Sequence, residues 1–178
     1  MRTRRQEKQR GQALVELAIS VPVLLWLLLG SFDASVMVSD KVIAGYATRQ
    51  GARLAAEIGG KETNPASNTS NIDADIVANV LAVARAMNYS VLQEIDIYAP
   101  KSSTGVLNKG TDLYDQFDGK GVNQNGYAFD YALREQIPPN ETSVGVRLVW
   151  VYSPPTGFAS FNVVLNEFTV MKLSPVLL

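Results

Sequence analysis

The 178-residue sequence contains no cysteine and no histidine. Without thiols the chain forms no disulfide and has no cysteine nucleophile, and without imidazole it has no Ser-His-Asp triad. Zinc sites built from thiolate or imidazole ligands are excluded as well. The length fits one domain with an appended anchor. Much of enzyme chemistry is therefore ruled out, so an anchored hydrolase is disfavoured, and we expect neither catalysis nor a cofactor.

Aromatic residues are also scarce, at 8% of the sequence, and form no array on which bases could stack. The formal net charge is -1, from 16 Lys and Arg against 17 Asp and Glu. Basic residues nevertheless crowd the first ten positions, where Glu7 is the one acid. This basic run is short and stands beside an apolar segment, so we expect no nucleic acid partner.

One long apolar run stands out against this background. From Ala13 to Leu29 the only ionisable side chain is Glu16, and this length lies at the lower end of what crosses a bilayer. The basic residues before the run and the acidic balance after it follow the positive-inside rule. We expect a single-pass anchor in the cytoplasmic membrane, with its membrane part at about residues 13–35. The N-terminus would be cytoplasmic and the C-terminal domain exported; the alternative is the core helix of a soluble protein.

Two residues distinguish the run from an ordinary secretory signal peptide. Glu16 places a carboxylate where insertion costs about 2.5–3.5 kcal/mol, and Pro22 interrupts the apolar segment. A cut between Gly11 and Gln12 would create an amine four residues before Glu16, on the same helical face. That amine, from the same or an adjacent subunit, could neutralise the carboxylate. The alternative is that Glu16 reaches the membrane interface unaided.

The segment from Arg10 to Asp33, RGQALVELAISVPVLLWLLLGSFD, resembles the N-terminus of TadE-like minor pilins, or pseudopilins, of the tight-adherence (Tad, or Flp) pilus system. The resemblance continues in the small residues and arginines of AGYATRQGARLAA, Ala44 to Ala56. The positions that carry the first part are Gly11, Glu16, Pro22, Gly30 and Asp33.

The resemblance implies that a membrane-embedded prepilin peptidase removes a basic leader, residues 1–11, by cleaving after Gly11. It also implies a role of Glu16 in processing or assembly and a helix kink at Pro22. The expected partners are the peptidase, other pilin or pseudopilin subunits, the inner-membrane assembly platform and the lipid bilayer. Leu17 replaces the tyrosine of the major pilin, which favours a minor subunit that primes, caps or supports the pilus. The alternative is a permanently anchored binding or adhesion module that never enters a filament.

Helical spacing continues past the membrane and predicts one helix over residues 12–58, about 70 Å long, which must protrude from the bilayer. Its exported half is rich in small residues that let another element approach closely. The candidate helix-packing residues are Gly45, Gly51, Ala52 and Arg53, either within the chain or against another subunit. Gly59 and Gly60 end the helix.

The predicted architecture is a pilin-like α+β fold. A linker over residues 59–71 leads to an exported domain at 72–178, in which a second helix packs on a small antiparallel sheet. The second helix is predicted at Ile72–Met87, with Asn71 as its N-cap and Asp73 near its positive dipole end. The strands are predicted at Val91–Ala99, Ser143–Tyr152 and Phe168–Leu173.

Between the first two predicted strands lies an insertion, Pro100–Thr142, with a short helix predicted at Tyr127–Gln136. A glycine-rich part of the insertion carries acidic and amide side chains, of which Asp115 and Asp118 are candidate calcium ligands. The ligand spacing of an EF-hand is absent. A solvated loop is therefore the favoured interpretation, and we expect no metal.

Overall fold

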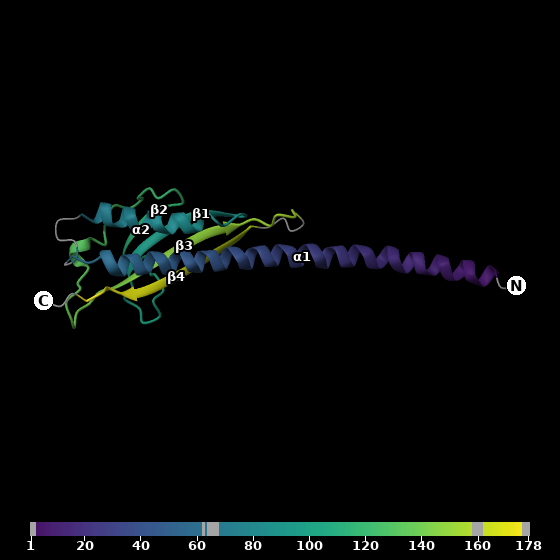
Figure 1. Cartoon of the computed structure of the whole chain (residues 1–178), viewed down its shortest axis with the longest axis horizontal. Helices are drawn as coiled ribbons and strands as arrows, with labels where there is room; N and C mark the ends of the chain where they lie inside the picture. Colours follow the sequence, from purple (N-terminus) through teal and green to yellow (C-terminus); the bar gives the residue numbers. More distant parts are fainter. Residues whose placement is uncertain (1–2, 62, 64–67, 158–161, 176–178) are drawn as a thin grey trace.

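The computed structural model describes residues 3–61, 63, 68–157 and 162–175. It is an α+β structure in which one long helix lies against a sheet at its C-terminal end and projects far beyond it at the other (Figure 1). The predicted pilin-like architecture is thereby confirmed. The elements are α1 (Thr3–Ile58), α2 (Thr69–Ala84), β1 (Ser90–Ala99), β2 (Leu113–Asp118), the short η1 (Tyr131–Leu133), β3 (Ser143–Tyr152) and β4 (Val163–Lys172).

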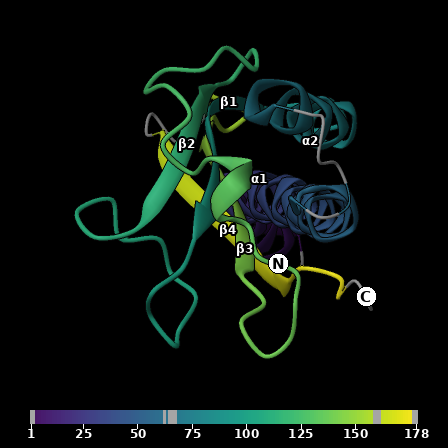
Figure 2. The ribbon, with the colours of Figure 1, turned by 90° about the vertical axis from the view of Figure 1, so that its left-hand side faces the viewer.

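The sheet is antiparallel throughout, with the strand order β2-β1-β3-β4. Both long helices cover the same face of the sheet, as Figure 2 shows. The core lies between these layers, and its centre is made of alternate β3 residues, which are the ones predicted to share a face. They are Val144, Val146, Leu148 and Trp150, all 0% exposed.

The C-terminal half of α1 approaches the core closely because it presents small side chains. Ala44, Ala47, Ala52 and Ala55 are fully buried. At Gly51 there is no room even for a methyl group, since a Cβ there would stand 2.4 Å from Val80 Cγ2. This half of α1 therefore packs within the chain, against α2 and the sheet.

Several element boundaries differ from the predicted ones. The helix α2 begins at Thr69, and its N-cap is Asn68, whose side chain accepts a hydrogen bond from the Asn71 backbone N–H at 3.0 Å. The prediction of Asn71 as the cap was wrong because the polar residues before it already form the first helical turn. β4 starts at Val163 rather than at Phe168. The predicted helix at residues 127–136 is only the short turn η1.

The fourth strand, β2, was not predicted. Its sequence LYDQFD places Asp115 beside Phe117 on the face that points to the helices, so apolar alternation does not reveal it. The acid is tolerated there because Arg134 reaches it from the connection between β2 and β3. The predicted insertion at 100–142 thus contains part of the sheet.

Arg134 is the centre of a buried charge cluster. Its guanidinium is 0% exposed, contacts Asp73 of α2 through two nitrogens at 2.7 and 3.0 Å, and lies 3.3 Å from Asp115 of β2. It also donates to the Phe129 carbonyl at 2.8 Å. Asp73 was predicted to complement the helix dipole, but its carboxylate instead pairs with this arginine. The cluster joins α2, β2 and the β2–β3 connection.

The cluster holds two acids and one cation, so it carries an excess negative charge when both acids are ionised. Burial, and after it the hydrogen-bonded neighbour Asp73, raises the pKa of Asp115 to about 7. On the other face of the sheet, burial also raises the pKa of Asp96 to about 7. Both carboxyls are therefore easier to bury when protonated.

We predict that Gly51→Ala destabilises the fold by roughly 1–3 kcal/mol, because the new methyl group collides with the stiff, buried Val80 side chain. The matched control is Gly45→Ala on the same helix, where a Cβ would lie 3.9 Å from Glu167 Cγ. That variant should be neutral or stabilising, through helix propensity. Thermal melting of the full chain in detergent measures both, and equal melting temperatures would contradict the packing argument.

We further predict that the free energy of unfolding rises as the pH falls from about 7 to about 5, by roughly 1–3 kcal/mol. The folded pKa values of Asp115 and Asp96, about 7, exceed those of the unfolded chain, so the folded state binds more protons in this window. Asp115→Asn should reduce the slope, since Arg134 and Asp73 remain a neutral pair. Asp118→Asn is the control and should leave the slope unchanged, because hydrogen bonds from backbone N–H groups lower the pKa of Asp118. A flat profile in the unmodified chain would contradict the prediction.

Candidate functional site

The part of α1 from Leu14 to Leu28 is largely apolar and exposed. Its large apolar side chains from Leu14 to Leu28 are 39–67% exposed. An 18-residue window in this helix has a mean hydropathy of 2.2, and none of it is buried. Exposing so much contiguous apolar surface to water is unfavourable. The segment therefore fits a single-pass membrane anchor.

Gly11, Gln12 and Glu16 lie on this projecting part of α1, and all three are exposed. The helix continues through them and begins at Thr3, several residues before the predicted start. Gln12 Nε2 donates a hydrogen bond to Glu16 Oε1 at 3.1 Å. The side chains of Gln12 and Glu16 therefore meet on one helical face.

Pro22 lies inside α1, and the helix runs through it without a break (Figure 1). Proline has no backbone N–H, so the helical hydrogen bond to the Ala18 carbonyl is missing at this point. Around it, Leu25, Trp26 and Leu29 line a shallow apolar hollow. The predicted kink at Pro22 stays a prediction.

Two acids fix the sheet domain to α1 just beyond the apolar segment. The Asp33 carboxylate accepts hydrogen bonds from Thr156 Oγ1 at 2.6 Å and from the Thr156 backbone N–H at 3.3 Å, and the Asp33 carbonyl accepts one from the Tyr152 hydroxyl at 2.7 Å. Two helical turns later, Asp40 accepts one from Ser90 Oγ at 2.6 Å. This clamp was not predicted. The only signal for it in the sequence is a seven-residue spacing that places both acids on one helical face.

The predicted helix-packing residues do not form one surface. Gly51 and Ala52 are buried inside the chain. Arg53 is exposed and pairs with Glu57 at 2.9 Å, one turn along α1. Gly45 instead borders a groove of about 300 Å³ between α1 and β4. Packing within the chain thus accounts for two of the four residues.

This groove, which we call the α1–β4 groove, combines apolar and charged side chains. Val38, Val42 and Tyr46 follow each other at one-turn intervals along α1 and are 57%, 55% and 59% exposed. Lys41, Arg49 and, from β4, Glu167 complete its lining. The sequence could not reveal the groove because Glu167 reaches α1 only through the fold.

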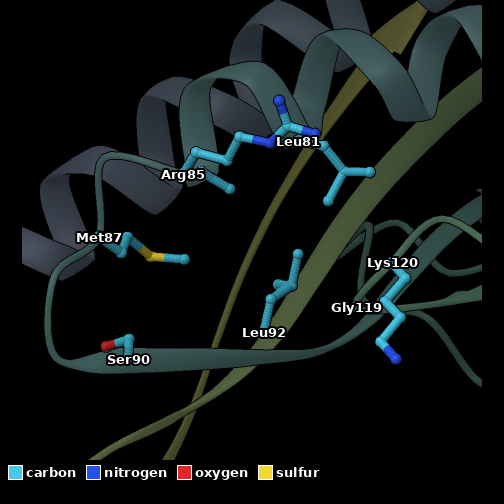
Figure 3. A pocket seen from close by; sticks show the side chains of 8 residues that line it. Leu81, Arg85, Met87, Ser90, Leu92, Gly119 and Lys120 are labelled. Carbon is cyan, nitrogen blue, oxygen red and sulfur yellow. The ribbon is translucent and has the colours of Figure 1, made fainter.

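A second hollow, of about 350 Å³, lies between the end of α2 and the start of β1. Leu81, Met87 and Leu92 point into it, while Arg85 and Lys120 stand at its rim (Figure 3). Its lining mixes polar and apolar groups, and none of the described residues that line it is an acid that could act with these cations. We assign it no chemistry.

The two candidate calcium ligands point to opposite faces of the sheet, since they are three residues apart on one strand. Asp115 faces the helices and contacts Arg134. Asp118 accepts hydrogen bonds from the backbone N–H groups of Lys120 and Val122, both at 2.9 Å, and so closes a turn. Across the described residues, no group of three acidic, histidine or cysteine side chains is placed to hold a metal ion.

Comparison with known proteins adds one finding. The family model described as TadE-like protein matches residues 11–53. The match starts at the candidate processing glycine and ends on the last turns of α1, so the sheet domain lies outside it. No curated protein and no solved structure matches the chain.

The family match covers most of the residues on which the resemblance in the sequence rests, from Gly11 to Arg53. Through this segment, the chain is similar to TadE-like proteins.

Proposed function

We propose that this chain is a minor pilin-like subunit of a Tad pilus, cleaved after Gly11 by a prepilin peptidase and assembled through α1. In this role it primes, caps or supports the filament and performs no catalysis. The observation that carries the proposal is the apolar stretch of α1 from Leu14 to Leu28, whose large side chains are 39–67% exposed in the isolated chain. Such a helix needs lipid before assembly and neighbouring helices after it.

The contact between Gln12 and Glu16 supports the cleavage site. After a cut at Gly11, the new amine would belong to residue 12, whose side chain already touches the Glu16 carboxylate at 3.1 Å. If the new amine reached the Glu16 carboxylate, its positive charge would lower the penalty for keeping that carboxylate in an apolar environment. Before the cut, the Gln12 side chain that meets Glu16 is a neutral amide. Cleavage would therefore change the electrostatics of the helix end at which subunits pack.

The clamp at Asp33 and Asp40 supports the role of α1 as both anchor and scaffold. It attaches β3 and the start of β1 to the helix immediately after the apolar segment. A force or displacement applied to the anchored helix would then be transmitted to the sheet. On this proposal the exported domain lies close to the membrane surface. The prepilin peptidase, the pilin partners and the assembly platform are located on or in the same membrane.

We predict that Gly11→Ala blocks maturation, since a side chain at this position hinders an extended segment from entering a protease cleft. The unprocessed product should be heavier by the eleven leader residues. Mass spectrometry of the N-terminus measures this, and a terminus at Gln12 in the variant would contradict the proposed cleavage site.

The matched control for this experiment is Gly30→Ala. Gly30 lies on the same helix, and neither glycine has any neighbouring atom within 4 Å of its added Cβ. The control should therefore be processed normally. An intact N-terminus in the unmodified chain would instead favour the permanently anchored binding module.

We also predict that Glu16→Ala allows membrane insertion but impairs assembly, because the neighbouring amine loses its counter-charge. Glu16→Gln keeps a hydrogen-bond acceptor and removes the charge, so it should fail in the same way. Membrane fractionation measures insertion, and electron microscopy or shearing measures piliation. Normal piliation with Gln but not with Ala would assign the glutamate a hydrogen-bonding role instead.

A further inference from the structure

The two edge strands of the sheet, β2 and β4, differ in whether other described parts of the chain cover their outward backbone groups. At the β2 edge the chain itself supplies partners: Asn125 accepts from the Gln116 N–H at 2.8 Å and donates to the Tyr114 carbonyl at 3.1 Å. Backbone bonds from Gln124 to Gln116 at 2.7 Å and from Asp118 to Val122 at 2.9 Å complete the cover. The β2 edge is therefore closed to any further strand.

The β4 edge has no such cover in residues 3–61, 63, 68–157 and 162–175. β4 pairs with β3 over ten residues in one continuous register without a bulge. It contains no proline, and its two charged residues are Glu167 and Lys172. A long, regular edge of this kind is a template for another strand, and proteins normally protect such edges.

The hydrogen-bond pattern tells which backbone groups face outward. Leu173, just past β4, donates its N–H to Thr142 on the β3 side at 3.0 Å. Backbone groups alternate in an antiparallel ladder, so odd-numbered residues of β4 face β3 and even-numbered residues face away. Ser174 agrees, since its N–H points away from β3 and bonds to the Ala56 carbonyl at 2.9 Å. The outward residues are Val164, Asn166, Phe168, Val170 and Lys172.

The α1–β4 groove lies beside this edge, as its lining by Glu167 requires. Val38, Val42 and Tyr46 extend over about 12 Å of helix, which alternate residues i, i+2 and i+4 of a strand also cover. Lys41 and Arg49 add two cations against the one carboxylate of Glu167. The groove thus fits a strand with alternate apolar side chains and an acidic residue.

We infer that the β4 edge binds an extended, apolar and acidic segment of another protein, which adds to the sheet as a fifth strand. Backbone hydrogen bonds supply the affinity, and the α1–β4 groove supplies specificity by contacting alternate side chains of the added strand. A second copy is a poor source of an antiparallel fifth strand. Its β2 edge is closed, and in-plane antiparallel pairing of two β4 edges would turn the α1 helices antiparallel. One membrane does not allow that arrangement, a step that rests on the proposed anchoring of α1.

The probe that tests this inference is a synthetic ten-residue peptide of alternating Val and Thr with Asp at one end, added to the full chain in detergent micelles. Amide hydrogen exchange is followed residue by residue by NMR. We expect exchange at Val164, Asn166 and Phe168 to slow about tenfold or more, with little change at the odd-numbered residues between them. The same peptide N-methylated at alternate residues should have no effect.

Two variants sharpen the test. Asn166→Pro removes an outward N–H and no bond to β3, so it should weaken peptide binding about tenfold or more while Asn166→Thr binds normally. Reversing both cations, with Lys41→Glu and Arg49→Glu, should favour a peptide ending in Lys over the one ending in Asp. If Asn166→Pro fails to fold, as judged by circular dichroism, the N-methylated peptide decides the matter.

Three results would overturn the inference. The first is no slowing at about 1 mM peptide, where even weak strand pairing is detectable. The second is that the N-methylated peptide slows amide exchange in β4 equally. The third is that amide exchange slows without peptide as the protein concentration increases, which would show that two β4 edges pair with each other. None of these measurements depends on leader cleavage or piliation. Failure here would therefore leave the proposed function standing, and a blocked pilus would not affect this result.

Discussion

The exposed apolar surface of α1 is the constraint on which the rest of the structure depends. A helix that is apolar on all sides is unstable in water as a free projection, so its N-terminal half requires lipid or other apolar helices. The C-terminal half of the same helix is amphipathic and buries alanines and Gly51 against α2 and the sheet. One continuous element thus connects two environments. The clamp at Asp33 and Asp40 marks the place where one gives way to the other.

In the sheet domain, buried charged side chains connect separate segments of the chain. Arg134 holds Asp73 and Asp115 in a fully buried cluster, and so it joins three segments that are distant in the sequence. Such clusters seldom add much net stability, but losing one member leaves an unpaired charge and is costly. The cluster also sets the position of β2, whose outer edge is covered by the chain. The β4 edge is not covered in this way by the residues that the structure describes, and it lies beside the α1–β4 groove.

Much of the fold could be predicted because its signals are local. The length and apolarity of α1, the glycines that end it, and the alternation of β3 all follow from neighbouring residues. The bounds of β3 matched the prediction for this reason. β2 was missed because its inward residue, Asp115, is polar and is made acceptable by Arg134 from another segment. The N-cap of α2 was misplaced by one turn, since several adjacent polar residues can serve as caps.

By itself the sequence determined the long apolar helix, the charge asymmetry around it and the placement of residue 12 and Glu16 on one helical face, because hydrophobicity, charge and helical periodicity are properties of neighbouring residues. Only the tertiary structure decided which small residues of α1 are buried, how Asp33 and Asp40 hold the sheet, and that the chain covers the β2 edge. These features depend on contacts between residues far apart in the chain. Their partners are chosen by the packing of layers, which no local pattern encodes.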